Sequence, residues 1–451
     1  MKRLSRTLGL FAILAGFAGA ETMEERVKAL EEKLKLKEED EGEAPAPGSP
    51  AAEAASKAID VFFNEGFKFK SKDGNFSGHI GGRVIWHARL FSNMNERQKV
   101  DTFAFRQVKL EMSGKLWKDF AFKVQLNTTG SSVALDDGIV GFERFYFAKL
   151  HIGQFKAPMS LEELTTTRFI DLPERSVLNR LVPAREVGLM LFGEPFEKIV
   201  GYQIMLANGN GRNGPDENSD KDIIARAYLR PFATMESDFI KNLHIAVSGS
   251  AGRRDVAAGV LPYTFSDPMT ATTFANRGSA GASFKFDENR YRLQAELAWL
   301  FGPASFKAEW LRTSDRFTDL NAGDHNRTNI HSYYVSASVL LTGEMKTWDR
   351  IRPNKPLFGG GVGAIEIAAR FSKLWFDRDI FDDGVLNRDT SAKEVYEYAI
   401  GVNWYPNMHT RVSVAYVHEQ YRSEAHTESL VLAGTREDGV DMFIFRAQID
   451  F

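Results

Sequence analysis

Residues 443–451 read FIFRAQIDF, and two kinds of side chain alternate along this stretch. One set of alternate positions is entirely apolar and consists of Phe443, Phe445, Ala447, Ile449 and Phe451. The other set runs from Met442 and Ile444 to Arg446, Gln448 and Asp450. A period of two places the two sets on opposite faces of a β-strand. The sequence therefore predicts a final strand with an apolar outer face and a largely polar inner face.

The same alternation recurs from about residue 76 to residue 451. In residues 79–90, for example, Val84 and Trp86 alternate with Arg83 and His87. Further alternating segments lie at residues 108–116, 120–127, 199–208, 242–250, 330–341, 364–373 and 410–417. Many strands with one apolar and one polar face are typical of a barrel that crosses a membrane around a polar lumen. We predict an all-β fold, namely one transmembrane antiparallel β-barrel.

A soluble β-sandwich also has alternating strands, but three features of this chain favour the barrel. The polar faces carry charges at mid-strand. Short turns such as 117–119 and 406–409 alternate with long polar loops such as 209–221 and 377–393. Aromatic residues gather near strand ends, as at Trp299. Short turns on one rim, long loops on the other and aromatic girdles fit a barrel inserted from one side.

The predicted number of strands is about sixteen. Residues 278–300 give this number if they form one long bulged strand, whereas a turn at residues 287–289 would give seventeen. Single-chain bacterial barrels have even numbers of strands, so we predict sixteen. A barrel of this size leaves an aqueous channel along its axis.

The chain divides into a signal peptide (1–20), a short coiled-coil helix (21–41), a linker (42–57) and the barrel (58–451). The signal peptide has a basic start and an apolar run that is too short to span a bilayer. Met23, Val27, Leu30 and Leu34 have heptad spacing, which fits a short coiled coil or a solvated amphipathic helix. Export followed by a barrel predicts a location in the outer membrane of a Gram-negative bacterium.

Composition argues against catalysis and against several kinds of partner. The 451 residues include no cysteine, and their nine histidines have no metal-ligand spacing. Gly359–Gly361 lacks the lysine and the serine or threonine of a phosphate-binding loop. The near-neutral formal net charge of -3 does not by itself indicate any class of partner, and we predict no nucleic-acid partner. We therefore predict neither an enzyme nor a protein with a metal or a cofactor.

Several segments, in order along the chain, resemble the phosphate-selective porin family, porins O and P. They include RQVKLEMSGKLWKDFAFKVQLN (106–127), HIGQFKAPMSLEELTTT (151–167), GAIEIAARFSKLWF (363–376) and GVNWYPNMHTRVSVAYVH (401–418). The resemblance implies a sixteen-stranded trimeric barrel in outer-membrane lipid whose third extracellular loop folds into the lumen. A final strand ending in Phe451 also resembles the signal by which outer-membrane proteins are recognised by the barrel insertion machinery.

The residues expected to line the pore and bind anions are basic. The loop that should enter the lumen contributes Lys156, Arg168, Arg175, Arg180 and Arg185, and the wall contributes Arg83, Lys109, Lys123 and Arg370. Among inward positions of the clearer strands, basic residues outnumber acidic ones by about two to one, and basic rings attract anions. The sequence therefore predicts a channel for small anions such as phosphate.

Two alternatives stay open at this point. A general-diffusion porin without phosphate specificity would have the same strands. A structural or adhesive outer-membrane barrel would also have them, and the heptad segment could then engage another envelope component. Ion-selective conductance separates a porin from a barrel with a plugged lumen.

Overall fold

The computed structural model describes residues 58–92, 101–214, 216, 218–266, 268, 270, 273–278, 280, 283–423, 430–432, 435–437 and 439–451. The predicted signal peptide, coiled coil and linker lie outside these residues, so they remain predictions.

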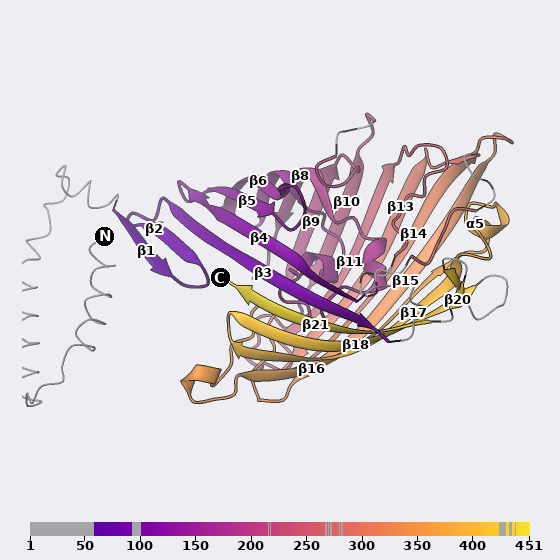
Figure 1. The fold of residues 1–451 in the computed structure, drawn as a ribbon. Helices are drawn as coiled ribbons and strands as arrows, with labels where there is room; N and C mark the ends of the chain where they lie inside the picture. Colours follow the sequence, from indigo (N-terminus) through magenta and orange to yellow (C-terminus); the bar gives the residue numbers. More distant parts are fainter. Residues whose placement is uncertain are drawn as a thin grey trace, which may run out of the picture. The chain divides into compact units, whose positions relative to one another are not determined.

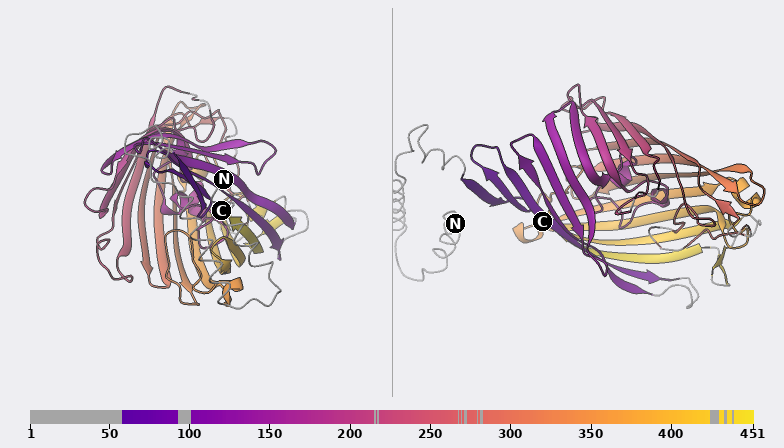
Figure 2. Two further views of the ribbon diagram at one scale, coloured as in Figure 1. Left: turned by 90° about the vertical axis from the view of Figure 1, so that its left-hand side faces the viewer. Right: turned by 90° about the horizontal axis from the view of Figure 1, so that it is seen from above.

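Within the described residues, sixteen antiparallel strands close into a barrel (Figures 1 and 2). They are β3 (Ser77–Phe91), β4 (Thr102–Leu116), β5 (Phe120–Asn127), β6 (Ala134–Phe145), β7 (Ala148–Lys156), β8 (Arg185–Gly193), β9 (Val200–Ala207), β10 (Asp222–Leu229), β11 (Asn242–Arg253), β13 (Asn289–Phe301), β14 (Ala304–Asp319), β15 (His325–Leu340), β16 (Ala364–Phe376), β17 (Ala392–Asn407), β18 (Thr410–Ser423) and β21 (Gly439–Asp450). The barrel closes where β21 pairs with β3, in a register that runs from Met442↔Phe91 to Asp450↔Arg83. The predicted all-β barrel of sixteen strands is confirmed.

The remaining strands are short additions to this barrel. β1 (Ile59–Phe63) and β2 (Phe67–Ser71) form a hairpin that extends the sheet beside the start of β3. β12 (Phe284–Lys285) pairs with β14, as β13 does, so residues 284–301 form one interrupted strand. β19 (Leu430–Leu432) and β20 (Thr435–Glu437) pair only with each other. Counting residues 278–300 as a single strand was therefore correct.

The helices of the described residues are single turns. They are α4 (Leu161–Leu164), η1 (Val177–Arg180), η2 (Leu357–Gly359) and α5 (Asp379–Asp382). None of the helices in this part of the chain is long and apolar enough to cross a membrane.

The two faces of each strand have opposite chemistry, as the alternation predicts. In β21, Phe443 and Phe445 are about 40% exposed on the outside, whereas the alternate residues Ile444 and Arg446 are buried inside. Leu110 and Val124 are likewise exposed on the outer wall. The outer surface can therefore face lipid, while the charged side chains of the strands face the lumen.

Long connections fill part of the lumen near the loop end of the barrel. Three such connections contribute to one buried apolar cluster, which includes Met159, Val177, Phe265, Phe274 and Phe381. Two segments matter for the site. We call residues 157–184, between β7 and β8, the constriction loop, and residues 341–363, between β15 and β16 at the opposite end, the turn-side segment.

Candidate functional site

The constriction loop lies inside the barrel and is held there through its backbone. Arg370 of β16 donates a hydrogen bond to the carbonyl oxygen of Glu174 at 2.8 Å. Arg411 of β18 donates to the carbonyl of Ile170 at 2.6 Å, and Arg446 of β21 also donates to loop carbonyls. Arginines of three strands that do not adjoin β7 or β8 therefore hold the loop by hydrogen bonds. The loop crosses the lumen, as the family resemblance implied.

A cavity of about 190 Å³, the basic cavity, lies between this loop and the wall formed by β3 to β8. Its lining includes seven of the nine basic residues predicted from the sequence: Arg83, Lys109, Lys123, Lys156, Arg168, Arg175 and Arg185. Three carboxylates, Glu111, Asp137 and Glu163, also line it. The cavity therefore carries an excess of positive charge.

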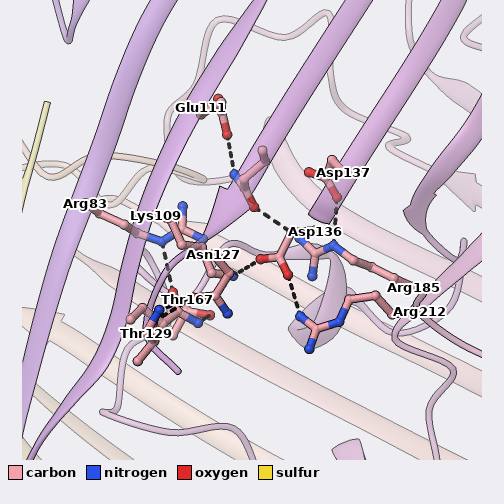
Figure 3. A network of polar contacts seen from close by, with 12 residues as sticks. Arg83, Lys109, Glu111, Asn127, Thr129, Asp136, Asp137, Thr167, Arg185 and Arg212 are labelled. Atoms are coloured by element: carbon pink, nitrogen blue, oxygen red, sulfur yellow. Dashed lines mark hydrogen bonds and ion pairs between the residues drawn. The ribbon is translucent and has the colours of Figure 1, made fainter. Parts of the chain in front are cut away.

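Three wall cations of the basic cavity pair with carboxylates, and Figure 3 shows two of them, Lys109 and Arg185. Lys109 forms an ion pair with Asp136, which also pairs with Arg212. Lys123 and Arg185 both reach Asp137, at 3.0 Å and 2.7 Å. These cations are therefore held in place, and part of their charge is already balanced.

Lys156, at the end of β7, and Arg175 of the constriction loop hold the short helix of this loop. The Nζ of Lys156 lies 3.3 Å from the carbonyl oxygens of Leu164 and Thr165, and Arg175 donates to the carbonyl of Thr165 at 2.9 Å. Cations at the carbonyl end of a helical turn are electrostatically favourable. Burial opposes ionisation of Glu163 beside them, but Arg175 and Lys156 outweigh it and lower the pKa of its carboxyl. These two residues chiefly give the loop its shape.

Arg83 and Arg168 keep the largest share of their hydrogen-bonding capacity. The Nε of Arg83 donates to the side-chain oxygen of Gln107 at 2.9 Å, and no carboxylate of the described residues lies within 4.0 Å of its guanidinium. Arg168 has its nearest carboxylate, Asp450, at 3.9 Å, and its buried Nε has no partner in the described part of the chain. Both guanidiniums can donate to an anion in the cavity.

The other two predicted residues do not line the basic cavity. Arg180 donates to the carbonyl of Ser266, which joins the constriction loop to the connection between β11 and β13. Arg370 pairs with Glu397 at 2.9 Å and with Glu162 at 3.1 Å. Both side chains act as supports for the loop.

The basic excess predicted for inward positions of the clearer strands does not extend to all buried side chains. Among the described residues, fifteen carboxylate side chains are buried, against ten lysine and arginine side chains. Six of the buried carboxylates lie at strand positions outside the sequence prediction; they are Asp136, Asp137, Glu186, Asp222, Glu397 and Glu419. Asp136 and Asp137 are adjacent in β6 and both buried at a register shift, so a strict period of two places only one of them in the lumen. Positive charge prevails locally, in the basic cavity.

The turn-side segment was also missed. Its Lys346 is 6% exposed and lies 2.8 Å from Asp171 of the constriction loop, and it also pairs with Glu366 of β16. Trp348 contacts the ring of His244 on β11. The signal in the sequence was the length of the connection between Leu340 and Ala364, because the other connections at this end of the barrel contain fewer residues. This segment therefore supports the constriction loop from the turn end.

Among the described residues, no group of three or more histidine, aspartate or glutamate side chains is placed to hold a metal ion. The sequence model of one protein family, phosphate-selective porin O and P, matches residues 79–451. The chain belongs to this family. Porin O of Pseudomonas aeruginosa is 25% identical over 421 residues, which cover 86% of this chain and 91% of that protein.

Solved porin structures share the fold at low sequence identity. OmpF of Salmonella typhi, in complex with daunomycin, is 10% identical, covers 87% of this chain and 100% of its own, and has a TM-score of 0.52. OmpT of Vibrio cholerae, in vitro folded and in trimer form, is 10% identical, covers 83% and 99%, and has a TM-score of 0.51. The protein is thus an outer-membrane porin of a Gram-negative bacterium, and its family and fold point to a channel rather than an enzyme.

Proposed function

We propose that this porin selects small anions, and phosphate in particular, at the basic cavity beside the constriction loop. The observation that carries the proposal is the local charge: seven cations and three carboxylates line one cavity at the loop. Arg83 and Arg168 are the proposed direct contacts, because their guanidiniums have the fewest competing partners in the described part of the chain.

The chemistry of guanidinium suits this role. A planar guanidinium presents paired donors that match the oxygens of a phosphate, whereas lysine acts as a compact point charge. A solute must also leave again, so binding in a channel has to stay weak. The carboxylates behind Lys109, Lys123 and Arg185 serve this need, since they reduce the attraction that those cations exert on a passing anion.

The test is block of the chloride current by phosphate in planar bilayers. For the double variant Arg83→Gln, Arg168→Gln we expect the half-blocking phosphate concentration to rise by about tenfold or more, because two charged hydrogen-bond donors are lost. The matched control is Arg253→Gln, Arg316→Gln, which removes two exposed arginines near the loop end. Equal phosphate block in all three proteins would show that Arg83 and Arg168 are not the anion contacts, and absence of block in wild-type protein would make this a general-diffusion porin.

We propose further that the porin is a homotrimer, as the family resemblance implies. The trimer form of the structurally similar OmpT supports this assembly. Light scattering in detergent should give three times the mass of the mature chain. A monomeric mass would contradict the proposed assembly and leave the selectivity proposal untouched.

A further inference from the structure

A second cavity, of about 460 Å³, lies on the side of the constriction loop that faces the turn end of the barrel. We call it the aromatic cavity; its lining includes Phe169, Arg226, Tyr228, Arg230, His244 and Trp348. Phe169 comes from the constriction loop and Trp348 from the turn-side segment, while the other four come from β10, its end and β11. The volume is within the range of sites that hold small organic molecules.

Flat groups form a continuous wall in this cavity. The ring centroids of Trp348 and His244 lie 5.8 Å apart, and those of His244 and Tyr228 lie 5.4 Å apart. The guanidiniums of Arg226 and Arg230 each lie 5.0 Å from the ring centroid of Tyr228. Trp348 is 37% exposed, so its indole is accessible from the lumen. Such a wall offers planar surfaces on which the ring of a solute can stack.

The charge of the aromatic cavity is also positive at its surface. Of the described residues that line it, two are arginines and none is a carboxylate. The partner of Arg226 is Glu296, which lies 2.7 Å away and is fully buried in the wall behind it. Arg230 pairs with Glu194, but its buried Nε has no partner among the described residues. A flat solute with a negative charge therefore fits this lining best.

The two cavities border the same residues of the constriction loop. Leu164 and Thr166 of the constriction loop line both of them, Arg168 lines the basic cavity, and Phe169 lines the aromatic one. A solute that passes Leu164 and Thr166 has the cationic donors of the basic cavity on one side and the aromatic wall on the other. One molecule with an anionic end and a ring can use both.

We propose that the aromatic cavity is a second subsite of the pore, which takes the ring of a phosphate monoester that bears an aromatic group. This subsite rests on the proposed phosphate selectivity, because the basic cavity takes the phosphate end of the same molecule. The pore then prefers aromatic phosphate esters to inorganic phosphate and to aliphatic phosphate esters.

The experiment compares block of the chloride current by inorganic phosphate, methyl phosphate and phenyl phosphate in planar bilayers. Phenyl phosphate should block wild-type protein at a concentration about tenfold lower than methyl phosphate, which is the advantage expected from one aromatic contact. Trp348→Ala should remove this advantage and change the block by inorganic phosphate by less than about twofold. Phe169→Leu, which alters the other side of the cavity, should reduce the advantage in the same way.

The matched control is Trp375→Ala, because Trp375 stacks on His331 near the loop end of β16, outside the lumen. It should keep the full preference for phenyl phosphate. Equal block by phenyl and methyl phosphate in wild-type protein would overturn the subsite while inorganic phosphate still blocks. An equal loss of all three blocks in Trp348→Ala would overturn it too, since Trp348 would then only support the loop. If no phosphate blocks wild-type protein, the proposed selectivity itself fails and the subsite with it.

Discussion

The basic residues that the sequence predicts as equal candidates have different roles in the structure. Lys156 and Arg175 hold the helical turn of the constriction loop through backbone carbonyls. Lys123 shares carboxylates with its neighbours. Arg83 and Arg168 have few competing partners in the described part of the chain. Side-chain charge alone therefore does not identify an anion contact. The hydrogen bonds and ion pairs that a cation already makes determine whether it can bind an anion.

Glu174 joins the constriction loop to the wall and makes the loop sensitive to acid. It is 2% exposed and accepts from Arg106 and, at 3.2 Å, from Arg89. Burial opposes its ionisation, but Arg106 and the neighbouring cations outweigh this and lower the pKa of Glu174 to about 2. A lowered pKa means that the contact stabilises the loop fully above the ordinary pKa and loses this effect as pH falls towards 2.

Single-channel recordings between pH 7 and pH 2 test this contact. We expect the current noise to rise as the pH falls below about 4.5, because about 3 kcal/mol of loop stabilisation is lost on protonation. Glu174→Gln should be noisy already at pH 7 and should show no further step over this range. Glu236→Gln, which changes an exposed residue between β10 and β11, should behave as wild type. A quiet Glu174→Gln channel at pH 7 would contradict this role.

At the scale of elements, the constriction loop is supported from two directions. Wall arginines hold its backbone, and the turn-side segment reaches it through Lys346, which lies between Asp171 and Glu366. Asp171 has a second cation, Lys307, whereas among the described residues Lys346 is the cation that pairs with Glu366. Removing Lys346 leaves the buried Glu366 without its cation, and breaking a buried pair in this way costs about 3 to 5 kcal/mol. The loop and this segment should therefore lose stability together.

Lys346→Met tests the link between the two elements. We expect its thermal unfolding midpoint in detergent to fall by several degrees or more, because Glu366 stays buried without its paired cation. Lys355→Met is the matched control, since Lys355 lies in the same segment and is exposed. Equal midpoints for the two variants would show that Lys346 contributes no support.

The strands could be predicted from the sequence, whereas the packing of the connections could not. Alternation is a local signal, so the faces of Phe445 and Arg446 follow from the order of neighbouring residues. The contact of Lys346 with Asp171 joins positions that are 175 residues apart, and no periodic pattern marks it. Alternation also fails at Asp136 and Asp137, because the register shift in β6 buries both of these neighbours. The sequence predicted seven cations of the basic cavity, but it did not predict the carboxylates Asp136 and Asp137 with which some of them pair.

At the scale of the whole barrel, neighbouring residues face two different solvents. Ile204 of β9 is 48% exposed on the outer wall, whereas Gln203 beside it lines the aromatic cavity inside. Lysine on the lipid face of a barrel costs about 2 to 4 kcal/mol at the bilayer midplane. The same lysine in the lumen remains in water.

Ile204→Lys should therefore reduce the amount of folded barrel in the outer membrane far more than Gln203→Lys. The amount is measured as the heat-modifiable fraction on gels of isolated membranes. Equal yields of the two variants would be incompatible with the assignment of these two faces to lipid and to water.

If the constriction favours anions, the reversal potential in a potassium chloride gradient will show it. The purified protein in a planar bilayer should give a potential with the sign of chloride selectivity, and Arg83→Gln, Arg168→Gln should move it towards zero. A wild-type potential at zero, or one with the sign of potassium selectivity, would show that the constriction does not favour anions.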